Sequence, residues 1–285
     1  RDGLQNEPGE IVTDTKLELI KRLAACGLKK IEATSFVSPK WVPQMADHTA
    51  VMQALDHDGP VRDAALVPNM KGLESALATG VREIAVFAAA SESFSRKNIN
   101  CSIDESIERF APVFEAAHNQ DIHVRGYVSC IAGCPYEGEI APEAVAKVAA
   151  TLFRQGCYEI SLGDTIGVGT PHKINTVLDH VTANVPVENI ALHCHDTYGQ
   201  ALANIYAGLQ KGVRTFDTSV SGLGGCPYAK GASGNVASED VVYMMDGMGF
   251  ETGVDLDKLI DTSWFIAKAL GREPDSKLAY ARKPE

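Results

Sequence analysis

The feature that most constrains this chain is a regular alternation of short apolar segments with longer amphipathic ones. Seven short segments read as strands: Lys29–Phe36, Ala64–Pro68, Glu83–Ala88, His123–Ser129, Tyr158–Gly163, Ile190–His195 and Thr215–Val220. A window with helical periodicity follows each of them. Strands that alternate with helices in this way predict an α/β fold with a parallel sheet.

Several helical windows begin at residues that commonly cap helices. Ser102 precedes the window Ile103–Asn119, and Glu105 follows it three residues later, which is the pattern of a capping box. Thr13 is the expected N-cap of a helix over Asp14–Cys26. These signals support the division of the chain into strand–helix units.

The number of units favours a TIM (β/α)8 barrel. A closed barrel of this kind has eight strands, and the first helical window follows the loop Arg1–Val12, so we expect strand one to lie upstream of Arg1. The C-terminal helical window Leu256–Leu270 is expected to pack outside the barrel. No linker-like stretch interrupts residues 1–285, which we predict to form a single domain. An open doubly wound sheet, with ligands bound where the strand order reverses, is the alternative.

Charge and composition exclude several classes of protein. The net charge is −11 and no basic stripe is visible, so no nucleic-acid partner is expected. No run of apolar residues is long enough to span a membrane. The seven cysteines include no CxxC pair, which indicates a reducing compartment. All of them except Cys226 are expected to be buried as small hydrophobic residues. We expect a bacterial cytoplasmic location, with the mitochondrial matrix as the alternative, because a leader could have preceded Arg1.

In TIM barrels the chemistry gathers at the carboxyl ends of the strands and in the loops that follow. The polar residues at those ends are Arg1, Asp2, Glu32, Thr34, Ser35, Asn69, Asp164, Thr165, His193, His195, Asp196, Asp217, Ser219 and Ser221. These residues are therefore the candidates for the functional site.

His193 and His195 are the first candidates. They stand two residues apart on a predicted strand, so both imidazoles face the same side, which in a barrel is the lumen. Two imidazoles that converge at a strand end suit a divalent metal ion. The alternative is a pair of histidines that hydrogen-bond for structural reasons.

Two oxygen donors are candidates to complete a metal site. Asp2 lies where strand one is expected to end, and Asn235 lies in the loop 231–237. Two nitrogens and two oxygens that leave positions open for substrate suit Mg²⁺ or Mn²⁺, whereas zinc also binds imidazoles well. A residue second from the start of a chain is otherwise commonly frayed and exposed.

Three further residues are candidates for catalysis. Glu32 shares a strand face with Thr34, and a carboxylate inside a barrel needs a partner or a function. Arg1 could pair with Glu32 or hold a developing oxyanion. Cys226 lies at the tip of the loop Gly222–Tyr228, whose three glycines permit close approach to a ligand, and its thiol could serve as acid, base or nucleophile. The alternatives are a plain salt bridge and an ordinary turn with an inert cysteine.

Together these segments resemble the 3-hydroxy-3-methylglutaryl-CoA (HMG-CoA) lyase family of metal-dependent TIM-barrel lyases. The matching segments are Arg1–Glu7, Glu32–Met45, Gly163–Gly167, His193–Gln200 and Ser221–Asp240, which span nearly the whole chain. The segment Gly222–Asn235 is similar to the signature loop of that family. The His-Cys-His and Arg-Asp motifs are shared more widely, including with isopropylmalate and homocitrate synthases.

The resemblance implies cleavage of HMG-CoA into acetyl-CoA and acetoacetate, a reaction of leucine degradation. It also implies a Mg²⁺ or Mn²⁺ ion bound by Asp2, His193, His195 and Asn235. An acyl-CoA is the implied partner, and such barrels are commonly homodimers. Candidate contacts for the CoA tail are Lys40, Lys97 and Lys230.

The resemblance further implies roles in proton transfer. Asp2 or His193 would take the proton of the substrate's hydroxyl group, and Arg1 would stabilise the enolate that cleavage leaves. Cys226 would then protonate the enolate carbon, and Glu32 would complete the proton network. Asp164 is similarly placed at a strand end, where it could instead be a turn residue.

Three other functions are alternatives. A Claisen-type condensing enzyme of the same barrel group usually carries a long C-terminal extension, for which this chain has no room after Leu270. An aldolase acting on 4-hydroxy-2-oxo acids would not be expected to have the Gly-Gly-Cys-Pro-Tyr loop either. A non-catalytic barrel that binds CoA or metal would keep its metal site but have no turnover.

Overall fold

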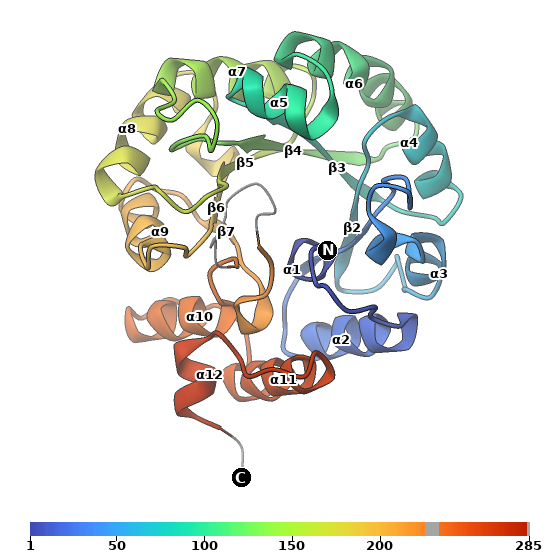
Figure 1. Cartoon of the computed structure of the whole chain (residues 1–285), viewed down its shortest axis with the longest axis vertical. Coiled ribbons are helices and arrows are strands. Elements are labelled where there is room, and N and C mark those ends of the chain that lie inside the picture. Colours follow the sequence, from blue (N-terminus) through green and yellow to red (C-terminus); the bar gives the residue numbers. More distant parts are fainter. Residues whose placement is uncertain (226–233, 284–285) are drawn as a thin grey trace.

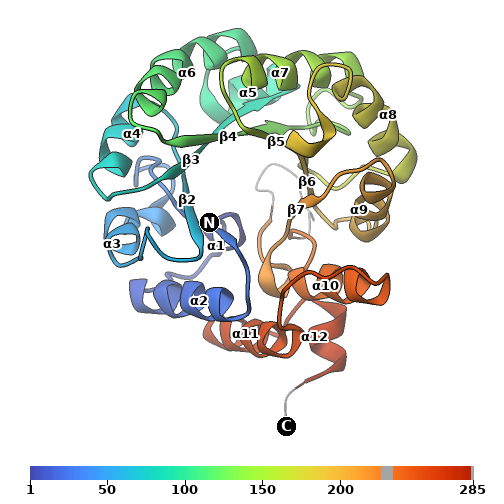
Figure 2. The same cartoon turned by 180° about the vertical axis from the view of Figure 1, so that it is seen from behind.

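The computed structural model describes residues 1–225 and 234–283. Seven parallel strands form one sheet, and each strand hydrogen-bonds to the next one along the chain. The sheet curls around a central space, and the helices lie on its outer side (Figures 1 and 2). The strands are β1 (Lys30–Ser35), β2 (Arg62–Leu66), β3 (Glu83–Ala89), β4 (His123–Ser129), β5 (Glu159–Asp164), β6 (Ile190–Cys194) and β7 (Thr215–Asp217).

Helices connect successive strands and continue beyond the last one. The α-helices are α1 (Asp2–Gln5), α2 (Thr13–Ala25), α3 (His48–Gln53), α4 (Met70–Leu77), α5 (Glu92–Ile99), α6 (Ile103–His118), α7 (Pro142–Arg154), α8 (Pro171–Val181), α9 (Ala201–Gln210), α10 (Ser238–Gly247), α11 (Leu256–Ala269) and α12 (Lys277–Ala281). Short 3-10 helices are η1 (Pro43–Met45), η2 (Val187–Asn189) and η3 (Val220–Gly222). In the part of the chain described, no helix combines the length and apolar character needed to cross a membrane.

The monotonic strand order confirms the TIM-barrel type of α/β fold. An open doubly wound sheet would reverse its strand order at a switch point, and the order β1 to β7 contains no reversal. Among the described residues no ladder joins β7 to β1, and the strand expected upstream of Arg1 stays a prediction. The amino group of Arg1 donates to the carbonyl of Glu32 on β1 (2.7 Å), so the N-terminus lies inside the ring of strands (Figure 1). That residues 1–285 form a single domain stays a prediction.

All seven predicted strands are present, but two local predictions are wrong. The strand predicted over Thr215–Val220 ends at Asp217, because the backbone then turns through Ser221 at φ 64°. The N–H of Ser219 pairs there with the carbonyl of Val236 (3.1 Å). Thr13 is the first residue of α2 and not its N-cap, since its hydroxyl donates to Asp47 (2.8 Å).

Other local predictions hold. The capping box of Ser102 and Glu105 is present at the start of α6. Helix α11 matches the predicted C-terminal window and packs against α2 on the outside of the barrel, where Leu259 and Ile266 are fully buried (Figure 2). The six cysteines of the described residues are free and buried, as expected: Cys26, Cys101, Cys130, Cys134, Cys157 and Cys194.

The main hydrophobic core lies between the sheet and its helices. It contains Ile84 and Val86 of β3, Leu73 of α4 and Phe110 of α6, all of them almost completely buried. Burial of side chains of this size stabilises the fold by about 1.5–3 kcal/mol each before entropy is counted. This packing holds the strands in place, so the side chains of the opposite face project into the lumen from a rigid frame.

Candidate metal centre

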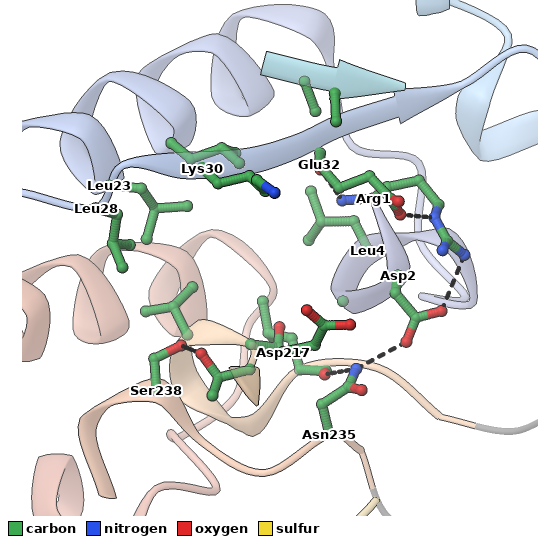
Figure 3. Close-up of a pocket in the computed structure, with 18 of the residues that line it drawn as sticks. Arg1, Asp2, Leu4, Leu23, Leu28, Lys30, Glu32, Asp217, Asn235 and Ser238 are labelled. Atoms are coloured by element: carbon green, nitrogen blue, oxygen red, sulfur yellow. Dashed lines mark hydrogen bonds and ion pairs between the residues drawn. The ribbon is translucent and has the colours of Figure 1, made fainter. Parts of the chain in front are cut away.

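A pocket opens inside the barrel, at the opening between β1 and β7 (Figure 3). One wall, formed by α1 and β1, carries Arg1, Asp2 and Glu32. The facing wall carries His193, Asp217 and Asn235, contributed by β6, β7 and the segment before α10. Charged side chains from distant parts of the chain therefore face one another across a few ångströms.

Three of these residues form a candidate metal site. The ligand atoms of Asp2, His193 and His195 all lie within 4.8 Å of one another. The Nε2 atoms of His193 and His195 are 3.9 and 4.0 Å from Asp2 Oδ2. Both imidazoles face the lumen, with ring centroids 5.3 Å apart, while Cys194 between them belongs to the core on the helix side. The alternation along β6 thus places both rings as the sequence indicates.

Asn235 joins the same cluster. Its backbone forms an isolated bridge with His195, and its Nδ2 donates to Asp2 Oδ2 (2.8 Å) and to the carbonyl of Leu223 (3.0 Å). Its Oδ1 is buried and has no hydrogen-bond partner among the described residues. An unsatisfied buried oxygen beside a carboxylate and two imidazoles fits a divalent cation.

The electrostatics of the site also favour cation binding. Burial alone would raise the pKa of Asp2, but the charge of Arg1 and then the two imidazoles lower it well below its usual range. Burial and the neighbouring His193 lower the pKa of His195 to about 4, so this imidazole is neutral at pH 7. Burial would also lower the pKa of His193, but its contact with Asp217 and the charge of Asp2 raise it. Metal ligands must be deprotonated, and Asp2 and His195 already are at neutral pH.

Arg1 links the metal cluster to Glu32. Its Nε donates to Glu32, and its Nη1 donates to Asp2 Oδ1 at 3.1 Å. The other oxygen of Glu32 accepts from the hydroxyl of Tyr127 (2.8 Å). The predicted salt bridge between Arg1 and Glu32 is present, and Figure 3 shows it next to Asp2. Because Arg1 bonds to both carboxylates, its guanidinium is held at the edge of the cluster.

Three further residues of the lumen, Arg125, Tyr127 and Asp217, have no role predicted from the sequence. The guanidinium of Arg125 donates to both oxygens of Asp217 (2.9 and 3.0 Å) and to the hydroxyl of Tyr127 (2.9 Å). Arg125 and Tyr127 could have been predicted from the same two-residue spacing that pointed to the histidines. Arg125 and Tyr127 stand two residues apart on a strand whose other residues are mostly apolar, so they share the lumen face.

Two glycines beside the cluster permit close packing of the backbone: Gly224, in the Gly222–Tyr228 loop, and Gly234, just before Asn235. Gly224 has φ 112°, and a Cβ there would lie 2.5 Å from Nδ2 of Asn235. A Cβ at Gly234 would lie 2.0 Å from the carbonyl oxygen of Gly222. Only glycine allows the backbone at 224 to contact the side chain of Asn235, and the backbone at 234 to contact the backbone of Gly222.

Cys226 and Lys230 lie outside the described residues. The flanking residues are described, and both are hydrogen-bonded: the carbonyl of Gly225 accepts from Asn6 Nδ2 (2.9 Å), and that of Gly234 accepts from the N–H of Asp196 (3.1 Å), the residue next to His195. Asp164 is fully buried and accepts from the N–H groups of residues 168 and 169 (3.1 and 2.8 Å). Asp164 ends β5, and its side chain accepts these bonds from the turn that follows the strand.

Comparison with known proteins identifies close relatives. Residues 1–266 match the family model described as HMGL-like. The chain is 58% identical over 281 residues to the cytoplasmic 3-hydroxy-3-methylglutaryl-CoA lyase of Rattus norvegicus, covering 99% of this chain and 82% of the relative. It is also 58% identical to the mitochondrial hydroxymethylglutaryl-CoA lyase of Gallus gallus, covering 99% of this chain and 94% of the relative. The crystal structure of hydroxymethylglutaryl-CoA lyase from Pseudomonas aeruginosa superposes with a TM-score of 0.96 at 56% identity, covering 99% and 94% of the two chains.

Proposed function

This chain belongs to the HMGL-like family, and from that premise we propose how the residues of its lumen carry out the reaction. The protein is a carbon–carbon lyase that cleaves HMG-CoA into acetyl-CoA and acetoacetate. This conclusion rests on identity above one half to such lyases along nearly the whole chain. A condensing enzyme, an aldolase or a non-catalytic scaffold is set aside on the same ground.

We propose that the lumen binds Mg²⁺ or Mn²⁺ through Asp2, His193, His195 and Asn235. The proposal is supported by the cluster of their ligand atoms and by the buried Oδ1 of Asn235, which has no partner among the described residues. When bound, such an ion polarises substrate oxygens and acidifies a coordinated hydroxyl group. Carboxylate and amide oxygens favour these two cations over softer metals.

Cleavage requires a base that removes the proton of the substrate's C3 hydroxyl. We propose Asp2 or His193 for this step, because Asp2 Oδ2 and His193 Nε2 lie 3.9 Å apart in the pocket. As the proton leaves, the hydroxyl oxygen becomes the ketone of acetoacetate. The C2–C3 bond breaks, and its electron pair forms the enolate of acetyl-CoA.

Arg1 is proposed to stabilise that enolate. Its guanidinium is charged at every relevant pH, because the carboxylates of Glu32 and Asp2 raise its pKa despite burial. A cation held in place by two carboxylates needs little reorganisation when negative charge develops nearby. Glu32 acts here by orienting Arg1, and its bond from Tyr127 fixes Glu32 in turn.

Cys226 is proposed to protonate the enolate carbon, which yields acetyl-CoA. The support comes from the described flanks of its loop, since Gly224 contacts Asn235 and Gly225 accepts from Asn6. We also propose that Lys40, Lys97 and Lys230 contact the CoA tail and that the protein is a homodimer. The proposed location is the bacterial cytoplasm, with the mitochondrial matrix as the alternative.

The direct test of the function is incubation with HMG-CoA. We expect acetoacetate to form with Mg²⁺ or Mn²⁺ and to stop forming when EDTA is added, because removal of the ion removes its charge stabilisation. Readdition of the ion should restore turnover. Formation of acetoacetate at an unchanged rate in EDTA would contradict the metal centre but not the lyase activity.

The role of Cys226 is tested by Cys226→Ala. We expect turnover to fall by roughly 10²–10⁴-fold, the usual contribution of a positioned acid, while metal binding measured by calorimetry stays unchanged. Cys226→Ser keeps a weaker proton donor and should lose less activity than Cys226→Ala. Wild-type turnover in the alanine variant would remove Cys226 from the mechanism.

A further inference from the structure

We propose that Asp217 is a positioning residue that sets the orientation and tautomer of His193 in the metal centre. The inference rests on the proposed metal site and adds a residue to it. Asp217 ends β7 and lies directly opposite His193 in the register of β6 and β7. Its Oδ2 lies 3.4 Å from Nδ1 of His193, on the side of the ring away from Asp2.

The carboxylate of Asp217 is itself held by several donors. Two nitrogens of Arg125 donate to its two oxygens at 3.0 and 2.9 Å, and the hydroxyl of Ser161 donates to Oδ2 at 2.7 Å. The side chain of Arg125 is only 4% exposed. A carboxylate bound in this bidentate way by a buried guanidinium has little freedom to turn, so it presents one fixed acceptor to His193.

A fixed acceptor at Nδ1 has a consequence at the other ring nitrogen. A neutral imidazole carries one N–H, and an adjacent carboxylate places that hydrogen on the nitrogen it faces. The lone pair is then left on Nε2, the atom that lies 3.9 Å from Asp2. Carboxylates that act on metal-binding histidines in this way keep the ring in position and make the ligand more basic.

His195 provides an internal contrast. Among the described residues no carboxylate is paired with its Nδ1, whereas Asp217 Oδ2 lies 3.4 Å from Nδ1 of His193. The two imidazoles of the centre therefore differ. Asp217 orients His193, while the backbone at the end of β6 and its bridge to Asn235 position His195.

Glu159 is a matched control for Asp217. It is the other carboxylate bound to Arg125, whose Nε donates to Glu159 Oε1 at 2.6 Å. It begins β5 and is buried, with its side chain 9% exposed. Its described ion pairs are with Arg125 and Lys30 and not with either histidine. Removal of its charge disturbs Arg125 without removing the group that faces His193.

The experiment compares Asp217→Asn with Glu159→Gln in the full-length protein without substrate. We expect both variants to melt at a lower temperature than the wild type in the metal-free state, because each loses a buried carboxylate of Arg125. Mn²⁺ titration by calorimetry should show a dissociation constant roughly 10–100-fold higher for Asp217→Asn and little changed for Glu159→Gln. Ser161→Ala removes one donor to Asp217 and should weaken Mn²⁺ binding by a smaller factor. It replaces Asp217→Asn in the test if that variant does not fold.

Two results would overturn the inference. One is an unchanged Mn²⁺ affinity in Asp217→Asn, or in Ser161→Ala where that variant replaces it. The other is an equal loss of Mn²⁺ affinity in Asp217→Asn and Glu159→Gln, which would make Asp217 no more than a structural partner of Arg125. Failure of the metal centre itself is distinguishable, because the wild-type protein would then show no Mn²⁺ binding at all.

Discussion

The two ends of the barrel lumen both carry buried charges, yet they pair those charges differently. At the amino ends of the strands, Lys30, Glu83 and Glu159 are the first residues of β1, β3 and β5. Lys30 Nζ lies 3.3 Å from Glu83 and 3.7 Å from Glu159, and Tyr158 donates to Glu83 at 2.6 Å. Each carboxylate at this end has a cation beside it.

At the carboxyl ends the pairing is incomplete. Oδ1 of Asn235 and Nδ1 of His195 are buried without a hydrogen-bond partner among the described residues, and they lie in the cluster that contains Asp2. An unpaired buried polar atom costs about 1–3 kcal/mol, and an ion held by Asp2, His193 and His195 would offset that cost for Oδ1 of Asn235. The contrast assigns stability to one end of the lumen and chemistry to the other, as in other TIM barrels.

The largest expected effect is that of His195→Ala. We expect a fall in turnover of at least roughly 10³-fold, because several kcal/mol of charge stabilisation are lost with the ion. Metal-free stability should change little, since the ring leaves with its unpaired nitrogen. The fall in turnover is measured with HMG-CoA, and the metal-free stability is measured by thermal unfolding without metal.

The control for this variant is His172→Ala, at an exposed histidine near the start of α8. It should leave turnover and Mn²⁺ affinity as in the wild type. If His195→Ala retained near wild-type metal affinity and turnover, the distinction between the two ends of the lumen would be lost.

The next largest effect is expected from Glu83→Ala at the amino end. The side chain is 2% exposed, and its removal leaves Lys30 without one of its two carboxylates. Breaking a buried ion pair costs about 3–5 kcal/mol when the remaining charge has no other partner. Lys30 is 30% exposed and keeps Glu159, so we expect a loss near the lower end, about 3 kcal/mol, which urea denaturation measures. Mn²⁺ affinity should be unchanged in the folded variant. A parallel loss of metal affinity would show that the two clusters are coupled.

The smallest effect concerns a buried carboxylate that no cation contacts in the described part of the chain. Glu239 is fully buried and accepts the N–H of Ser221 with both oxygens (2.9 and 3.1 Å). Burial raises its pKa from 4.5 to about 7. Because the folded protein favours the protonated form, this group contributes stability that is complete below pH 4.5 and is lost as the pH rises through 7.

Glu239→Gln isolates this contribution, because the amide does not titrate. Between pH 4.5 and pH 8 the stability of the wild type relative to the variant should fall by about 2–3 kcal/mol. Urea denaturation of both proteins across that range gives the difference. A difference that does not vary with pH would mean that burial does not penalise the Glu239 carboxylate.

Much of the frame was predictable, because its signals are local. The apolar segments located all seven strands, and the spacing of His193 and His195 placed both imidazoles on the lumen face, since strand side chains alternate with a period of two. The same spacing on β4, in Arg125 and Tyr127, would have extended the site. The length of β7 was not predictable, because the chain leaves the sheet where Ser219 pairs with Val236, a residue distant in the sequence.

The sequence by itself determined the fold class, the order of the strands and the face on which each candidate residue lies. Only the tertiary structure decided which of these residues meet. Asp2 meets Asn235, 233 positions away, and Arg125 meets Asp217, 92 positions away. Alternation along a strand is set by neighbouring residues, whereas the partner across a barrel depends on the closure and register of the whole sheet.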